Sequence, residues 1–335
     1  MQHFRVSFIV TLVCLAIAVY WGGAMGAFIA AILGVLEVSL SFDNAVVNAS
    51  ILKRMDERWQ QYFLTWGILI AVFGMRLLFP IAIVAAATGI GFVGVTDMAL
   101  HDPEQYATHL KASHIQIAAF GGMFLLMVFF SFLFDDAKEL HWLGKLEEKI
   151  ASFGKLESIE IILALSLLLG SQYALPQEVR LEALTAGVFG VILFVIVDSL
   201  SNLFEDEEEG EEMAEVIKKG SVMSFLYLEV LDASFSFDGV IGAFAITQDV
   251  VIIMLGLAIG AMFVRSLTVF LVRKGTLDEY VFLEHGAHYA IGTLAAIMLI
   301  SMSHEIPEVV TGLVGAILIG LSVFSSIRYK KKHAE

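Results

Sequence analysis

Residues 37–43 read E-V-S-L-S-F-D, and residues 232–238 read D-A-S-F-S-F-D. Both stretches fit the pattern [ED]-x-S-[LF]-S-F-D, and both lie inside long apolar runs. Carboxylates are rare in such runs, because an ionised side chain at membrane depth costs about 2.5–3.5 kcal/mol even on the mildest scale. The repeated motif therefore indicates both how the chain is built and where its functional groups lie.

The composition around the motif is that of an integral membrane protein. The chain is 58% hydrophobic with a mean hydropathy of +0.83, whereas soluble domains are about 45–50% apolar. Apolar runs recur from end to end, which predicts an all-α, polytopic helical bundle in contact with the lipid bilayer. A net charge of −15 argues against nucleic acid as a partner, and a single cysteine excludes a disulfide framework.

We predict about ten spans from the apolar runs. The first is expected to remain as an uncleaved helix, because the second follows it almost at once through Gly22 and Gly23; a cleaved signal peptide would leave nine. The predicted spans lie near 5–21, 24–51, 61–88, 114–134, 157–173, 181–204, 221–247, 250–272, 287–303 and 308–327.

Lysine and arginine support this count. With the N-terminus in the cytoplasm, the outside segments hold only Lys111 and Arg180, and two further residues, Arg76 and Arg265, fall within spans. All the other lysines and arginines lie in inside segments. This distribution predicts that both termini are cytoplasmic.

The motif belongs to a longer internal repeat. Glu37 aligns with Asp232 and Asp43 with Asp238, and the motif spans are the second and the seventh. They therefore cross the bilayer in opposite directions, which is the inverted-topology plan of many secondary transporters. Further pairs recur in the same order: Ser39 and Ser234, Ser41 and Ser236, Gly67 and Gly256, Arg76 and Arg265, His114 and His288.

This repeat predicts two five-helix halves, 1–175 with the motif 37–44 and 176–335 with the motif 232–239. A loop at 205–219, containing the acidic run 205–212, lies on the predicted inside. The run is expected to be a solvated linker; the alternative is a loop that gathers cations.

The first motif places four polar side chains on one helical stripe: Glu37, Ser41, Asn44 and Asn48. Asp43 does not join them, because six residues correspond to a rotation of about 120°. Either each motif helix unwinds near S-F-D, or the two acids of each motif face different neighbours.

Two arginines lie at similar depth. If Arg76 and Arg265 faced four ionised acids, a charge of −2 would remain, which a divalent cation or two protons would balance. Oxygen ligands suit hard ions such as Mn²⁺, Mg²⁺ or Ca²⁺, and spacing does not choose among them. The alternative is that the acids and arginines only tie helices together.

Three further residues are candidates for a proton path, namely His114, His288 and Asp198. The alternative is that the histidines are ordinary interface residues and that Asp198 extends to the membrane surface. The sequence at 304–308 reads H-E-I-P-E, which lacks the second histidine of a zinc protease motif. We expect no enzymatic activity.

The two motifs resemble the signatures of the TerC family of bacterial membrane proteins, within the LysE-type transporter superfamily. The first signature, like E-x-x-L-S-x-D-N, is similar to residues 37–44, and the second, like D-x-x-F-A-x-D-S-I-P-A, is similar to residues 232–243. The likeness covers about 24–90 and 225–300. Ser236, Gly239 and Gly242 depart from the second signature, as in a divergent, longer branch.

The resemblance implies a multi-pass protein of the bacterial inner membrane that exports manganese(II), or one that acts in tellurium and metal stress. Its acids would then be metal ligands. We therefore expect a secondary transporter that exports a divalent cation, Mn²⁺ above all, by proton exchange, with no permanently bound cofactor. The expected ligands are Asp43, Asp238, Glu37, Asp232 and Asn44, supported by Ser41, Ser236, Asn48, Arg76 and Arg265.

Two rival functions remain open. One is a non-transporting membrane component of a stress-response or assembly complex. The other is transport of a small organic cation or amino acid, for which Phe42, Phe235 and Phe237 could line a site. A homo-oligomer is compatible with either reading.

Overall fold

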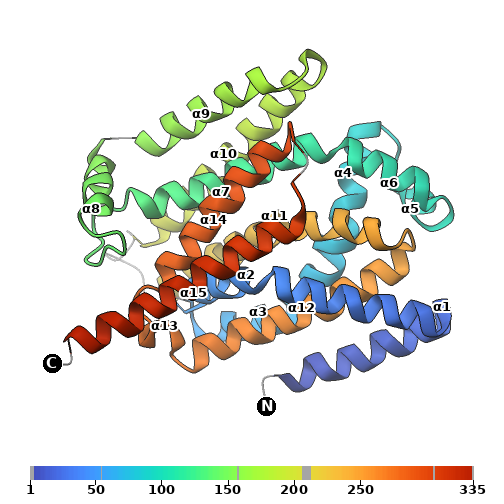
Figure 1. The fold of residues 1–335 in the computed structure, drawn as a ribbon, viewed down its shortest axis with the longest axis horizontal. Coiled ribbons are helices and arrows are strands. Elements are labelled where there is room, and N and C mark those ends of the chain that lie inside the picture. The colour runs from blue at the N-terminus through green and yellow to red at the C-terminus, as the bar shows by residue number, and fades with distance from the viewer. Residues whose placement is uncertain (1–3, 54, 157, 206–212, 305, 334–335) are drawn as a thin grey trace. The chain divides into compact units, whose positions relative to one another are not determined.

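The computed structural model describes residues 4–53, 55–156, 158–205, 213–304 and 306–333 (Figure 1). It also leaves certain side chains within these ranges undescribed, among them those of 235–238. All regular secondary structure in the described ranges is helical, which confirms the predicted all-α class.

Five helices in these ranges are long and apolar enough to cross a membrane. Two shorter apolar helices accompany them, at Arg76–Ala85 and Ile159–Ala174. The protein is therefore a multi-pass membrane protein whose helices contact lipid. The five long helices are Arg5–Leu40, His114–Leu133, Gln177–Ser199, Val250–Arg273 and Gly312–Lys332.

Contacts divide the chain into two compact units. The first unit comprises Met1–His114 and Phe204–Gly275, and the second Ile115–Leu203 and Thr276–Glu335. Both acidic motifs and the two arginines of the predicted spans, Arg76 and Arg265, fall in the first unit. These units are defined by contacts, whereas the predicted halves, 1–175 and 176–335, are defined by the internal repeat.

The first unit contains the helices that carry the motifs. Its helical segments are α1 (Arg5–Leu40), α2 (Phe42–Leu52), α3 (Glu57–Leu69), η2 (Ile70–Leu78), α4 (Phe79–Thr88), α5 (Phe92–His101), α6 (Pro103–Ala112), α11 (Met213–Ile246) and α12 (Val250–Arg273).

The second unit is assembled from the remaining segments. They are α7 (His114–Leu133), α8 (Lys145–Ala151), η3 (Ser152–Lys155), α9 (Ile159–Ser171), η4 (Gln172–Ala174), α10 (Gln177–Glu205), α13 (Thr276–Glu279), α14 (Leu283–Ser301) and α15 (Glu308–His333).

Helix α1 is a hairpin whose two arms both pack on α12. The Ser7 hydroxyl lies 2.6 Å from that of Ser266 near one end of α12, whereas a Cβ at Gly26 would lie 3.0 Å from Ile252 near the other end. Gly23 makes the turn with a φ of 66°, which glycine adopts without strain. The expected close succession of the first two apolar segments is thus observed.

A π-helix, η2, interrupts the chain between α3 and α4. Pro80 stands just after it and has no N–H, and its ring would clash with the carbonyl of Arg76 four residues earlier in an α-helix. A wider helical turn relieves that clash, and the N–H of Phe79 accordingly bonds the carbonyl of Gly74, five residues back. Arg76 lies within this π-helix, and such segments are frequent at functional sites.

The two motif helices differ in continuity. The first is interrupted at Ser41, between the end of α1 at Leu40 and the start of α2 at Phe42. The second runs without a break through Asp238 within α11. Of the two alternatives, unwinding near S-F-D is therefore found, over one residue, in the first motif and not in the second.

Candidate functional site

The first motif is anchored by an ion pair between Glu37, at the end of α1, and Arg76 in η2. Arg76 Nη2 lies 2.5 Å from Glu37 Oε1, and both side chains are about 95% buried. Glycines make room for the glutamate: a Cβ at Gly260 would overlap its Cβ and Cγ, and one at Gly239 would lie 2.8 Å from its Oε2. Glu37 is thus held among α11, α12 and η2.

Asp232 of the second motif lies between the two arginines. Its Oδ2 is 3.9 Å from Arg76 Nη1 and 3.6 Å from Arg265 Nη2. In the described part of the chain this oxygen is buried and accepts no hydrogen bond. A carboxylate shared at these distances is held by charge rather than by a tight hydrogen bond.

Arg265 is fixed more firmly on its other side. Its Nη2 lies 3.1 Å from Glu229 Oε1, its Nη1 donates to the Phe63 carbonyl at 2.7 Å, and its guanidinium stacks 4.1 Å from the Phe63 ring. A Cβ at Gly67 would overlap Arg265 Nη1. Packing and hydrogen bonds therefore define the position of this guanidinium.

Glu229 belongs to the candidate site, although it lies outside both sequence motifs and was not among the predicted site residues. It precedes Asp232 by three residues, so both carboxylates lie on one face of α11. That spacing, within the apolar stretch of α11 that also contains the second motif, is the feature that identifies Glu229 from the sequence. Its presence makes the network a chain of alternating charge, Glu37–Arg76–Asp232–Arg265–Glu229.

Asp43 and Asn44 of the first motif, and Asn48 one turn after it, are buried in α2, whereas Ser39 of the motif is exposed near the end of α1. Asp43 opens the helix, where the N-terminal dipole favours a carboxylate, and its Oδ1 accepts the N–H of Asn44 at 3.0 Å. Asn48 is 1% exposed, and its Oδ1 has no hydrogen-bond partner within the described ranges. The predicted stripe of Glu37, Ser41, Asn44 and Asn48 is buried throughout.

The corresponding part of the second motif is less completely described. The side chains of Ser236 and Asp238 lie outside the described set, so their predicted roles stay predictions. The helix carrying them is nevertheless placed, because the next residue, Gly239, faces Glu37. Ser234 is buried and its hydroxyl donates to the Val230 carbonyl at 3.0 Å.

Four described carboxylates and two guanidiniums lie buried in this unit, which gives −2 if all six groups ionise. Across the described residues, no group of three His, Cys, Asp or Glu side chains is close enough to hold a metal ion. Glu37 and Asp232, two of the predicted metal ligands, each contact an arginine, and their role as ligands stays a prediction. A cation binding at Glu37 Oε1 or Asp232 Oδ2 would compete with a guanidinium for that oxygen.

The predicted proton-path residues lie on three other helices, α7, α10 and α14. His288 is in α14, where its Nδ1 lies 2.9 Å from the Glu284 carbonyl and its ring stacks on Phe132 at 4.0 Å. Asp198 is half-buried in α10, and His114 begins α7. Of the predicted loop at 205–219, residues 206–212 are outside the described ranges. The rest is helical rather than loop, because α10 ends at Glu205 and α11 already includes 213–219.

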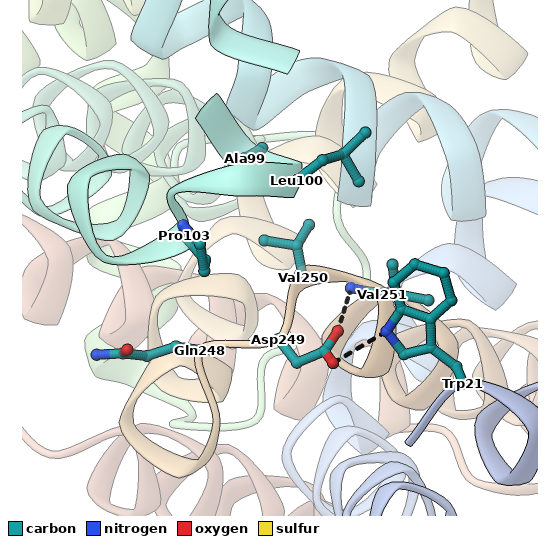
Figure 2. A pocket seen from close by; sticks show the side chains of 8 residues that line it. All are labelled: Trp21, Ala99, Leu100, Pro103, Gln248, Asp249, Val250 and Val251. Carbon is teal, nitrogen blue, oxygen red and sulfur yellow. Dashed lines mark hydrogen bonds between the residues drawn. The ribbon is translucent and has the colours of Figure 1, made fainter. Parts of the chain in front are cut away.

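A separate pocket of about 220 Å³ in the first unit lies around the start of α12 (Figure 2). Asp249 caps that helix, since its Oδ1 accepts the N–H groups of Val251 and Ile252, and its Oδ2 accepts the Trp21 indole N–H at 3.0 Å. The wall also contains Ala99, Leu100, Pro103, Gln248 and Val250. None of these is an acid of the two motifs.

Comparisons with known proteins identify the chain at the level of its family. The chain is 28% identical over 198 residues to "Uncharacterized membrane protein YceF" of Bacillus subtilis (strain 168), an alignment that covers 48% of this chain and 74% of that protein. No solved structure matches. The model of a family described as "Protein of unknown function (DUF475)" matches residues 42–333. The chain therefore belongs to the DUF475 family.

Proposed function

We propose that the protein is a secondary transporter that exports a divalent metal cation, with Mn²⁺ as the expected substrate, by exchange for protons at intramembrane carboxylates. The observation that carries the proposal is the buried chain of alternating charge from Glu37 to Glu229. Soluble cores rarely bury so many ionised groups, and within a membrane they mark ion or proton pathways.

The proposed architecture is ten spans in two inverted repeats, 1–175 and 176–335. The reversal at Gly23 supports two spans within α1. The interruption at Ser41 supports a broken helix at the site, as in other transporters whose half-helices meet near the bilayer midplane. Both termini would lie in the cytoplasm of a bacterial cell.

In the proposed cycle the arginines occupy the place of the substrate while the site is empty. Arg76 and Arg265 satisfy Glu37 and Asp232 at distances up to 3.9 Å. A divalent cation entering beside Asp43, Asp238 and Asn44 would compete for these acids, and Ser41, Ser236 and Asn48 would complete its oxygen surroundings. The long contacts of Asp232 make it the acid that a cation detaches most easily.

Export needs an energy source. Moving two charges outward against an inside-negative potential costs about 4.6 kcal/mol per 100 mV, from about 2.3 kcal/mol for each charge. Proton entry on the same carboxylates supplies that energy without a further site. His114, His288 and Asp198 are the proposed proton carriers outside the network.

The test is manganese efflux from cells after a manganese load, with wild type, Asp43→Asn and empty vector. We expect only the wild type to lower cell manganese. Equal manganese in all three, with the variant and wild type equally abundant in the membrane, would exclude Mn²⁺ export. Wild-type efflux by the variant would remove Asp43 from the mechanism.

A second candidate is a non-transporting membrane component of a metal- or tellurium-stress or assembly complex. The observation favouring it is that Glu37, Glu229 and Asp232 each face an arginine, as ties between helices would require. A soluble partner that co-purifies with the protein, and that is lost when the acids of 205–212 are changed to Gln and Asn, would support this candidate. Efflux that survives the loss of that partner would oppose it.

A further inference from the structure

A buried polar cluster in the second unit centres on Glu147 of α8, which is fully buried. Its Oε1 lies 3.2 Å from Lys138 Nζ, and its Oε2 accepts the Leu143 N–H at 3.1 Å. Lys138 in turn lies 4.0 Å from the centre of the Phe132 ring. These contacts fold residues 138–151, here called the docked segment, around one carboxylate.

His285 joins the docked segment to α14. Its Nε2 lies 2.9 Å from the Leu140 carbonyl and 3.6 Å from Glu147 Oε1. A second contact comes from Trp142, whose ring lies edge-on to Tyr289, 5.7 Å between centres. The carbonyl contact requires a proton on Nε2, so in the neutral ring Nδ1 carries none.

The other ring nitrogen explains why a second proton is unfavourable. His285 Nδ1 is buried and has no hydrogen-bond partner among the described residues. Protonation would create an N–H there without an acceptor, and it would add a second cation beside Lys138 at one carboxylate. Phe132 and Phe282 stand edge-on to the ring and exclude water from it.

We propose that the contacts of His285 with Leu140 and Glu147 hold the docked segment against α14, and that protonation of His285 releases this segment. These contacts are here called the pH-sensitive catch. The predicted topology puts both partners on the cytoplasmic side, just before the span at 287–303. The catch would therefore respond to cytoplasmic acidification, independently of what the protein transports.

The charges around the ring set the sign of the response. Burial lowers the pKa of His285 from its ordinary value of 6.5, and Lys138 lowers it further, whereas the Leu140 carbonyl, Glu147 and Glu284 oppose this. Serines of α15, Ser322 and Ser326, approach the same end of α14 and are neutral. The docked state thus binds fewer protons than the released state. Docking is complete above about pH 6.5 and weakens as the pH falls toward the lowered pKa.

Hydrogen exchange of the full-length protein in detergent tests the catch, with protection factors for 143–151 corrected for the intrinsic pH dependence of exchange. Between about pH 7.5 and pH 5.5, we expect wild-type protection to fall at least about fivefold, because the released state avoids one unsatisfied buried donor. His285→Gln keeps an N–H for Leu140 and cannot be protonated, so its protection should not change with pH. His141→Gln removes another histidine of the docked segment and should keep the wild-type transition.

Wild-type protection that does not change with pH would overturn the proposal, and so would a His285→Gln protein with the wild-type transition. If His285→Gln is already released at neutral pH, Lys138→Met decides. Loss of the neighbouring cation should shrink the acid transition, and a transition of unchanged size and midpoint would exclude the catch. Manganese efflux plays no part in these measurements, so the proposed function can fail without affecting them.

Discussion

Gly260 of α12 lies directly against the side chain of Glu37, and a Cβ at Gly260 would overlap the Cβ and Cγ of the glutamate. The position of the first motif's acid thus depends on a missing side chain on a helix more than 200 residues away in sequence. Glycine here serves close approach rather than an unusual backbone conformation, because α12 is regular through this residue.

Replacing Gly260 should therefore disturb both packing and the ion pair. Gly260→Val places branched carbons where Glu37 stands, and overpacking of this kind typically costs about 1–3 kcal/mol. We expect a lower melting temperature for the purified protein. Gly320→Val in α15 is the matched control, since a Cβ there has no neighbour within 4 Å. Equal melting temperatures for the two variants would contradict the packing seen at Gly260.

The ion pair of Glu37 and Arg76 should show strong coupling in a double-mutant cycle. Arg76→Met alone leaves the buried Glu37 carboxylate without its cation, and breaking such a pair typically costs about 3–5 kcal/mol. Glu37→Gln with Arg76→Met removes charge from both partners and should be less destabilised than Arg76→Met alone. Thermal unfolding of the four proteins measures the coupling. A cycle of Glu37 with the exposed Lys111 should be additive, and coupling of equal size there would refute the pairing.

The sequence predicts which residues form the candidate site more clearly than it predicts which of their side chains contact each other. The repeat singled out Glu37, Asp232, Arg76 and Arg265 because charged residues in apolar runs are rare. From the sequence, pairing between these acids and arginines is one of two alternatives. The structure brings the four side chains together, while their role in transport stays a prediction.

Two features could not be read from the sequence. The π-helix has only Pro80 as a signal, and proline after an apolar run equally predicts a kink or a helix start. The interruption at Ser41 without a matching one in α11 is also not encoded by the motif, since both copies share S-F-D. The two copies differ in their neighbours, since Glu37, just before the interruption, is enclosed by Gly239 of α11 and Gly260 of α12.

The hairpin turn of α1 should be sensitive to substitution at one glycine and tolerant at its neighbour. Gly23 has a φ of 66° and a ψ of −162°, a conformation essentially confined to glycine, so Gly23→Ala should cost about 1–3 kcal/mol. Gly22→Ala adds a Cβ 3.4 Å from Ile252, an ordinary contact. We expect a lower melting temperature for Gly23→Ala only. Equal effects of the two substitutions would argue against a tight reversal at Gly23.

Substitutions at the start of α12 should separate two contributions of Asp249 to stability. One is its N-cap of the helix, and the other is its hydrogen bond to Trp21. Asp249→Ala removes the acceptor of two backbone N–H groups, a loss of about 0.5–2 kcal/mol for an N-cap. Asp249→Asn keeps a capping oxygen and should lose less. Trp21→Phe removes the indole N–H, whose hydrogen bond is worth about 0.5–1.5 kcal/mol, together with part of the ring. Thermal unfolding should rank Asp249→Ala as the least stable of the three.

The contrary outcome would be that Trp21→Phe is the least stable. The indole ring would then stabilise this end of α12 more than the cap does, through its packing in the pocket wall (Figure 2).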